Sequence, residues 1–295
     1  MAPLVLRMSW TAVKAWWDDN APRLGASLAF YTLFAIAPIL LVAIGIAGAV
    51  FGADAVRGQI VGEVQGLLGR QGARAVQSLL QGASERKGNI LATIIGTITF
   101  ILTSTGAFLE LQAALNTIWR VKPRPGVNLK AFLLDRVRSF GLVVSMGFLL
   151  TVSLAVSAAL AALAGWLERR APGIPLILGV LDLALSLGVT TALFALLFRF
   201  LPDVRLRWRD VTTGAFITAL LFTIGKQFIG LYLGQGSTAS SYGAAGSVVV
   251  LLLWVYYASQ IVLLGAEFTR VYTRREGSKP QPESFAERTL STARH

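Results

Sequence analysis

The stretch Ser240–Arg270, SSYGAAGSVVVLLLWVYYASQIVLLGAEFTR, decides the fold class of this chain. Its residues from Ala244 to Ala266 carry no charge and are mostly apolar, and Glu267 follows directly. A helix needs about 20 apolar residues to cross the hydrocarbon core of a bilayer, at a rise of about 1.5 Å per residue. The stretch is therefore predicted to be a transmembrane helix.

The composition of the whole chain agrees with a membrane protein. Of its 295 residues, 55% are hydrophobic and only 14% are charged, and the mean hydropathy is +0.64. The lipid interior offers no water to backbone polar groups, so spanning segments are helices or closed barrels, and apolar runs of this length select helices. We therefore predict an all-α, polytopic membrane protein.

The residue types that most enzymes use are scarce. The chain has no cysteine, and its single histidine is His295. This excludes thiolate and imidazole zinc sites, disulfides and histidine acid–base chemistry from the rest of the sequence, and it holds no phosphate-binding P-loop motif. We expect no metal, no cofactor and no catalytic site, so the chain is predicted not to be an enzyme.

Apolar runs divide the chain into six predicted transmembrane helices. They cover residues 25–51, 90–119, 139–166, 176–201, 211–233 and 244–268. Residues 1–22 are predicted to form a cytoplasmic interfacial helix, residues 23–272 the membrane domain, and residues 273–295 a disordered basic tail.

Charge predicts the orientation of these helices. Lys and Arg number 27 against 15 Asp and Glu, a net charge of +12. Well over half of these basic residues lie in the segments that are inside when both termini are cytoplasmic, the excess that cytoplasmic segments carry. We therefore predict cytoplasmic termini, and basic inner loops that contact anionic lipid headgroups rather than a specific nucleic acid. Trp208, in the inner loop PDVRLRWRD, suits a headgroup position.

Two amphipathic regions lie outside the predicted spans. Leu6, Trp10, Val13 and Trp17 share one face of the N-terminal helix. We expect this helix to lie on the membrane or against the cytoplasmic ends of the bundle. Residues 52–89 are too polar to span, and their spacing predicts two short amphipathic helices at the outer surface, around a turn at Gly69 to Gly72.

Three segments resemble a known family: ASLAFYTLFAIAPILL at 26–41, LQAALNTIW at 111–119 and YGAAGSVVVLLLWVYYASQIVLLGAEFTR at 242–270. They are similar to the YihY/BrkB family of bacterial inner-membrane proteins, and the resemblance extends from about Trp16 to Tyr272. It implies six spans with inner termini in the bacterial inner membrane. The family has carried the labels of a tRNA-processing ribonuclease and of a virulence factor, and the resemblance brings no agreed catalytic residues.

Two opposite charges lie inside predicted spans. Asp182 is seven residues from Pro175 at the outer start of its span, and Lys226 is seven residues from Leu233 at the outer end of the next. Both are therefore about 10 Å below the outer surface. We expect an ion bridge between two helices; a substrate or proton site is an alternative, as is Lys226 extending outward to the surface.

Two acids are predicted near the inner interface, where several arginines are also expected. They are Glu110 and Glu267. In one interpretation they are salt-bridge partners that fix helix ends. In the functional alternative they gate a cytoplasmic opening or relay protons.

An uncharged loop precedes the last predicted span. Its residues able to hold an anion or a lipid headgroup at the helix N-terminus are Ser237, Thr238, Ser240, Ser241, Tyr242 and Gly243. Free backbone N–H groups and the helix dipole favour an anion at that place. Plain capping of the helix is the alternative.

These features favour transport, or the handling of a lipid or another amphiphile, across the inner membrane. Pro38 interrupts the first predicted span and is a predicted hinge, and the charges within spans add to the argument. A membrane scaffold is an alternative, because the small-residue stripe from Ser153 to Gly165 lets a helix of this chain, or of a second copy in a homo-oligomer, approach closely. A ribonuclease is less favoured, since the inner loops hold only scattered acids.

Overall fold

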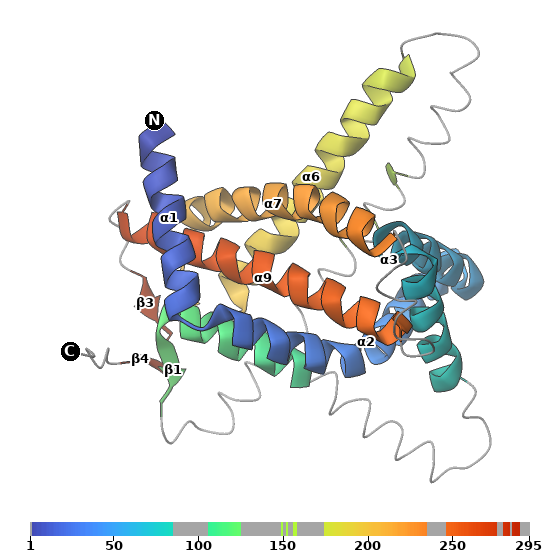
Figure 1. The fold of residues 1–295 in the computed structure, drawn as a ribbon, viewed down its shortest axis with the longest axis horizontal. Coiled ribbons are helices and arrows are strands. Elements are labelled where there is room, and N and C mark those ends of the chain that lie inside the picture. The colour runs from blue at the N-terminus through green and yellow to red at the C-terminus, as the bar shows by residue number, and fades with distance from the viewer. Residues whose placement is uncertain are drawn as a thin grey trace. The chain divides into compact units, whose positions relative to one another are not determined.

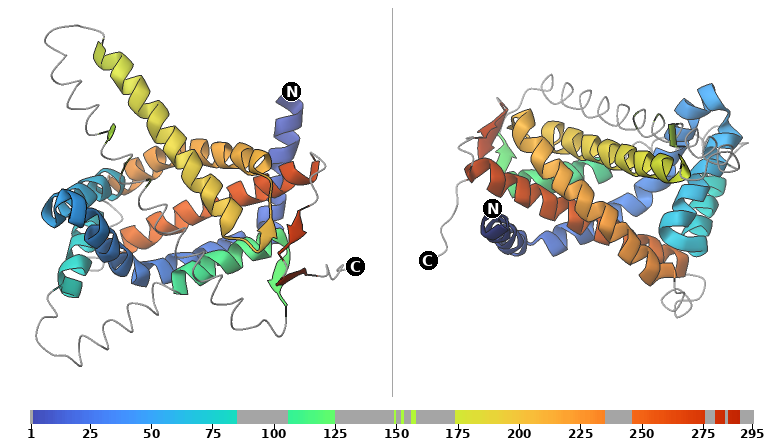
Figure 2. Two further views of the ribbon diagram at one scale, coloured as in Figure 1. Left: turned by 180° about the vertical axis from the view of Figure 1, so that it is seen from behind. Right: turned by 90° about the horizontal axis from the view of Figure 1, so that it is seen from above.

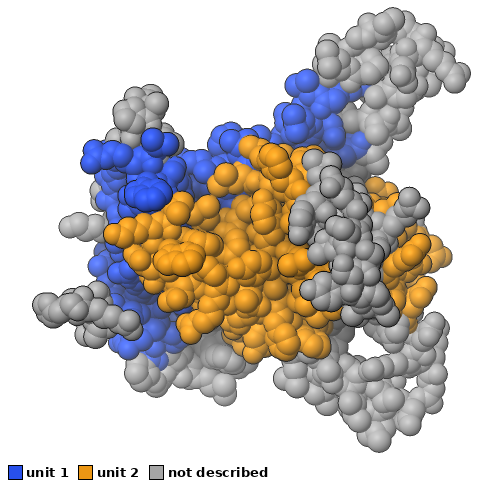
Figure 3. Space-filling view, viewed as in Figure 1, with its two compact units in different colours: residues 1–12, 115–220, 265–295 blue, residues 13–114, 221–264 orange. Residues whose placement is uncertain are grey.

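The computed structural model describes residues 2–84, 106–124, 149, 152, 156–157, 174–234, 246–275, 280–283 and 285–289. These residues belong to two compact units (Figure 3). Unit 1 comprises residues 1–12, 115–220 and 265–295, and unit 2 comprises residues 13–114 and 221–264.

Helices make up most of the described chain (Figure 1). The labelled helices are α1 (Ala2–Asp18), α2 (Ala21–Phe51), α3 (Ala53–Ser84), α6 (Ile174–Phe200), α7 (Trp208–Gly234) and α9 (Gly246–Arg275). Residues 106–119 form a further helix. The strands are β1 (Val121–Pro123), β2 (Val204–Arg205), β3 (Gln281–Pro282) and β4 (Ala286–Arg288).

Three helices are long and apolar enough to cross a membrane within the described residues. They are Leu178–Phe200, Trp208–Ile229 and Val248–Arg275, which match the last three predicted spans. A shorter apolar helix, Ala21–Ile36, overlaps the first part of the first predicted span, residues 25–51. Most of the predicted spans 90–119 and 139–166 lies outside the described residues. The helical membrane class is confirmed, and the number of six spans and the orientation of the termini stay predictions.

The break between α1 and α2 has a local cause. Asn20 adopts the left-handed conformation with φ 55°, and Pro22 stands in the first turn of α2. Asparagine tolerates this conformation better than most residues, and proline suits the first turn of a helix, where its missing N–H costs nothing. Helix α2 therefore begins four residues before the predicted span and continues through Pro38 to Phe51.

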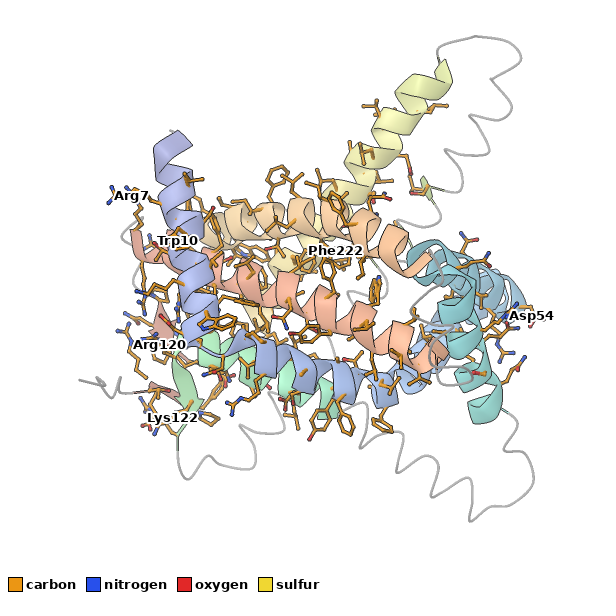
Figure 4. The ribbon with its side chains drawn as sticks, in the orientation of Figure 1. Arg7, Trp10, Asp54, Arg120, Lys122 and Phe222 are labelled. Atoms are coloured by element: carbon orange, nitrogen blue, oxygen red, sulfur yellow. The ribbon has the colours of Figure 1, made fainter. Side chains whose placement is uncertain are left out.

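Helix α1 exposes its apolar face. Leu6, Trp10 and Trp17 are largely exposed, whereas Met8 and Ala12 on the other side are buried. Figure 4 shows Trp10 and the charged Arg7 on this helix. The membrane-surface role of α1 stays a prediction, and the face predicted for it is largely exposed.

The polar segment after α2 differs from its prediction. It forms one helix, α3, and not two helices around a turn at Gly69 to Gly72. Val76 and Leu80 of α3 are buried with Ile44 of α2. A glycine inside a helix costs only about 1 kcal/mol, and this packing within unit 2 offsets that cost.

Helix α9 packs against α2 in unit 2 (Figure 2). Leu251 and Val255 of α9 are buried with Ala29 of α2. Val250 of the same helix is buried against Ile229 of α7. The first part of α9 thus buries apolar side chains against its neighbours.

Part of the tail predicted to be disordered forms strands in unit 1. Strand β4 pairs antiparallel with β1, and β3 pairs antiparallel with β2. Beside the strands, the N–H of Thr289 donates to the carbonyl of Arg120 over 2.9 Å, and the N–H of Arg124 donates to that of Phe285 over 2.9 Å. The strands Gln281–Pro282 and Ala286–Arg288 therefore differ from the predicted disorder. Strands this short carry no alternating pattern, and their partners are distant in sequence.

Candidate functional site

Helices α7 and α9 approach closely in unit 1 through two reciprocal glycine–threonine contacts. A Cβ placed on Gly214 would lie 2.7 Å from the Cβ of Thr269, and one on Gly265 would lie 2.8 Å from that of Thr218. Each threonine hydroxyl donates to a carbonyl of its own helix, Thr218 to Gly214 and Thr269 to Gly265, both over 2.7 Å. The contact therefore leaves no hydroxyl unsatisfied, and it fixes the part of α9 that carries the charges described next.

A buried ion pair lies in the same turns of α9 as this contact. The Nη2 atom of Arg270 is 2.8 Å from Oε2 of Glu267, and both side chains are almost fully buried. A buried charge is tolerated when it is paired and hydrogen-bonded. Glu267 is thus an ion-pair partner, which corresponds to the salt-bridge alternative for this residue; its place at the inner interface stays a prediction.

Arg270 also holds the end of the helix of residues 106–119. Its Nη1 atom donates a hydrogen bond to the carbonyl oxygen of Ile118. The chain turns just afterwards at Arg120, which has φ 55°. The last carbonyl groups of a helix lack intrahelical partners and attract positive charge. Arg270 therefore satisfies a carbonyl that the helix end leaves open.

A second buried pair joins the same helix to the segment between α6 and α7. Nδ2 of Asn116 donates to Oδ2 of Asp203 over 2.8 Å, and the N–H of Asp203 donates to Oδ1 of Asn116 over 2.8 Å. The carbonyl of Asp203 accepts from the N–H of Glu283 over 3.0 Å. Asp203 thus links a helix end, an interhelical segment and the tail. We call Asn116, Asp203, Glu267 and Arg270 the polar hub.

Basic side chains surround the polar hub. Arg274 lies within electrostatic range of Arg120, Arg270 and Arg288, and of Glu267 as well. Lys122 on β1 lies 3.3 Å from Glu287 on β4. Figure 4 labels Arg120 and Lys122 beside strand β1. Three arginines and one acid, Glu267, thus interact with Arg274, so its surroundings are positively charged.

The polar hub is built to hold helices together. Its carboxylates accept from an arginine and an amide, and none of its members is a nucleophile with an adjacent base. Within the described ranges, no group of three His, Cys, Asp or Glu side chains can hold a metal ion. Among the buried side-chain atoms of unit 1, Nε1 of Trp119 and Oδ2 of Asp210 are two that have no hydrogen-bond partner within the described residues; Oδ1 of Asp182 is another.

The structure places the two charges predicted to lie within the membrane in different units. Asp182 lies half-buried on α6 in unit 1, and Lys226 lies half-buried on α7 in unit 2. The Oδ1 atom of Asp182 is buried and has no hydrogen-bond partner in the described part of the chain. Because the two residues belong to different units, the ion bridge between them stays a prediction.

The other predicted site residues are placed in part. Glu110 is half-buried on the helix of residues 106–119, in unit 2. Pro38 lies within the continuous helix α2, and its role as a hinge stays a prediction. The predicted anion loop, residues 237–243, lies outside the described residues.

Sequence reasoning missed the pairing of Asn116 with Asp203. Asn116 was visible as part of the LQAALNTIW segment, but its partner stands 87 positions later in the chain. Asp203 is one of two acids in a segment rich in arginine. That pattern suggests a solvated loop, and only the fold reveals that the acid is turned inward.

Comparison with known proteins gives the family of this chain. A family model described as virulence factor BrkB matches residues 12–289. A UPF0761 membrane protein of Verminephrobacter eiseniae is 34% identical over 85% of the chain and 58% of its own length. Those of Ralstonia nicotianae and Pseudomonas paraeruginosa are 31% and 30% identical, over 84% and 89% of the chain.

These relatives are longer than the chain. The alignments cover 55% of the Ralstonia nicotianae protein and 63% of the Pseudomonas paraeruginosa protein. The chain thus spans a little over half the length of the relatives it matches. No solved structure matches it.

Proposed function

Because the chain belongs to the virulence factor BrkB family of membrane proteins, as the resemblance to YihY/BrkB indicated, we propose that it moves or handles a lipid or another amphiphile. We place it in the bacterial inner membrane, with both termini in the cytoplasm and anionic lipid headgroups as its partners. The printed names of its relatives state only that they are membrane proteins. We therefore infer the function from the residues of this chain.

We base the proposal on Asp182. It stands in α6, within the candidate span Leu178–Phe200, whose mean hydropathy is 2.1. Its buried Oδ1 atom has no hydrogen-bond partner among the described residues. An ionisable side chain inside a membrane is costly, and such residues mark substrate or proton pathways when they are kept.

The rest of α6 supports a special role for this carboxyl group. The hydroxyls of Thr190 and Thr191 donate to the carbonyls of Ser186 and Leu187 on the same helix, each over 2.7 Å. Their polarity is therefore satisfied within the helix. Leu181 and Leu183, on either side of Asp182, are exposed, as expected for a surface that faces lipid. Asp182 thus differs from these threonines, because its buried Oδ1 atom has no polar partner among the described residues.

The test measures lipid movement in proteoliposomes. Purified protein is reconstituted into vesicles with a fluorescent phospholipid, and exchange between the leaflets is followed by chemical quenching of the outer leaflet. We expect the wild-type protein to accelerate the exchange and Asp182→Asn to return it to the rate of protein-free vesicles. Asp54→Asn is the matched control, because Asp54 is exposed on α3. Wild-type vesicles that exchange none of several lipid classes would refute the proposal.

The ion-bridge alternative has its own test. If Asp182 and Lys226 form a structural pair, Lys226→Ala alone lowers stability more than Asp182→Asn combined with Lys226→Gln, because it leaves an unpaired buried carboxylate. If Asp182 instead serves a substrate, the double variant folds normally and still fails to move lipid. Thermal unfolding of the two variants beside the exchange assay separates these cases.

A further inference from the structure

The chain from the end of α6 to the start of α7 exposes several basic side chains. Its sequence, residues 199–210, holds four arginines and two acids. The structure separates them: Asp203 and Asp210 are buried, with 5% and 4% of their surface exposed, whereas Arg207 and Arg209 are exposed. Because the acids are turned inward, the surface is more positive than the sequence alone suggests.

One arginine of the segment is already neutralised. Nε of Arg205 is 2.9 Å from Oε2 of Glu283 in the tail. No described acid is seen paired with Arg199, Arg207 or Arg209, which leaves three guanidinium groups for an external anion. This is the charge that anionic lipid headgroups attract, at roughly a fivefold gain in affinity for each basic residue near the membrane surface.

Aromatic side chains stand beside these charges. The Cζ atom of Arg199 lies 5.6 Å from the centre of the Trp208 ring, within the range of a cation–π contact. Phe200 meets the same ring edge-on, with 5.8 Å between the ring centres. About half of Trp208 and of Phe200 is exposed. Tryptophan beside basic residues is typical of the headgroup level of a membrane.

An apolar stripe continues from this point along α7. Trp208, Thr212, Phe216 and Leu220 follow one another at four-residue spacing on one helix face, and all four are exposed. The hydroxyl of Thr212 donates to the carbonyls of Trp208 and Arg209 on its own helix, over 3.0 and 3.2 Å, so it adds no open polar group. The stripe spans about 18 Å along the helix axis, which suits an acyl chain.

We infer that this surface binds an anionic phospholipid, with its phosphate at Arg199, Arg207 and Arg209 and an acyl chain along Phe216 and Leu220. The positive charge of the arginines favours an anionic headgroup. The exposed apolar stripe of α7, which begins beside these arginines, favours a lipid over a free phosphate. The inference deepens the proposed function and rests on it for its biological meaning. Binding in detergent needs no movement across a bilayer, however, so the two can fail separately.

The experiment compares matched arginine pairs. Detergent-solubilised protein is titrated with phosphatidylglycerol or phosphatidylcholine, and bound lipids are counted by native mass spectrometry. We expect Arg207→Gln/Arg209→Gln to bind phosphatidylglycerol about 30-fold more weakly than wild type. The control Arg57→Gln/Arg74→Gln removes two exposed arginines of α3 and is expected to bind like wild type.

Two further variants make the outcome decisive. Arg207→Lys/Arg209→Lys keeps the positive charge and is expected to keep most of the phosphatidylglycerol binding. Binding by this variant also shows that the weaker binding of the Gln variant is not due to misfolding. Phe216→Ala/Leu220→Ala is expected to weaken the binding of the diacyl lipid and to leave unchanged the competition by soluble glycerol phosphate. Equal binding of phosphatidylcholine, or equal loss in the α3 control pair, would overturn the inference.

Discussion

The two parts of α9 are held in different ways. Residues 246–264, in unit 2, bury apolar side chains such as Leu251 and Val255 against α2. Residues 265–275, in unit 1, bury Glu267 and Arg270 in the polar hub. One continuous helix thus has an apolar part and a polar part. In the apolar part, many apolar side chains of similar size would pack. In the polar part, each charged or polar atom needs a defined partner.

The membrane makes this difference larger. Lipid tails are as apolar as leucine, so burying leucine between helices gains packing but little from the hydrophobic effect. Removing one partner of a buried ion pair leaves a charge without compensation, which is costly in any apolar medium. Substitutions in the polar part are therefore expected to cost more than substitutions of similar size in the apolar part.

Arg270→Met should have the largest effect. It leaves Glu267 buried beside an apolar side chain and removes the donor to the carbonyl of Ile118. We expect the free energy of unfolding in detergent to fall by about 3–5 kcal/mol, measured by denaturant titration. Glu267→Gln combined with Arg270→Met removes both charges and should recover a large part of this loss. If the double variant is no more stable than Arg270→Met, the burial of an unpaired charge is not the cause.

Asn116→Ala should come next. It removes two hydrogen bonds, of which one reaches the carboxylate of Asp203 and the other satisfies the N–H of Asp203. We expect a loss of about 3 kcal/mol, because hydrogen bonds to charged groups are worth more than neutral ones and the buried groups are left open. A double-mutant cycle with Asp203→Ala measures the coupling. Additive losses would show that the two side chains do not depend on each other.

The comparison also shows which parts of the structure the sequence predicts. The length and hydropathy of the run from Ala244 to Ala266 are enough to predict a membrane helix, because lipid imposes a simple length rule. Glu267 at the end of that run was recognised as an ion-pair candidate, but any of several arginines would have served as its partner. Arg270 stands only three residues after Glu267 on the same helix, whereas the pairing of Asn116 with Asp203 joins positions 87 apart in the chain.

Errors in the predictions have equally local causes. The turn predicted at Gly69 to Gly72 followed from glycine content, but Val76 and Leu80 pack on α2 and keep α3 continuous. Disorder was predicted for the tail from its polarity and its prolines. Its strands are held by backbone hydrogen bonds to β1 and β2, which composition does not reveal.

Leu251→Ala tests the apolar part of α9. Leu251 is 1% exposed in the cluster with Ala29 and Val255, and its truncation leaves a cavity. We expect a loss of about 2 kcal/mol, the lower end for a buried leucine, because lipid replaces water in the reference state. Leu253→Ala on the same helix is the control, since Leu253 is 36% exposed. An equal loss in both variants would mean that packing on α2 does not hold this part of the helix.

Glu287→Gln should have the smallest effect, although it too removes an ion pair of unit 1. Glu287 lies 3.3 Å from Lys122, and their side chains are 39% and 56% exposed. Water already solvates both charges, so we expect a loss of less than about 1 kcal/mol, reduced further by salt. The antiparallel backbone pairing of β4 with β1 remains intact in this variant. A loss as large as that of Arg270→Met would mean that side-chain charge holds the tail, whereas a small loss assigns that role to the backbone and leaves the charges of the tail free to vary.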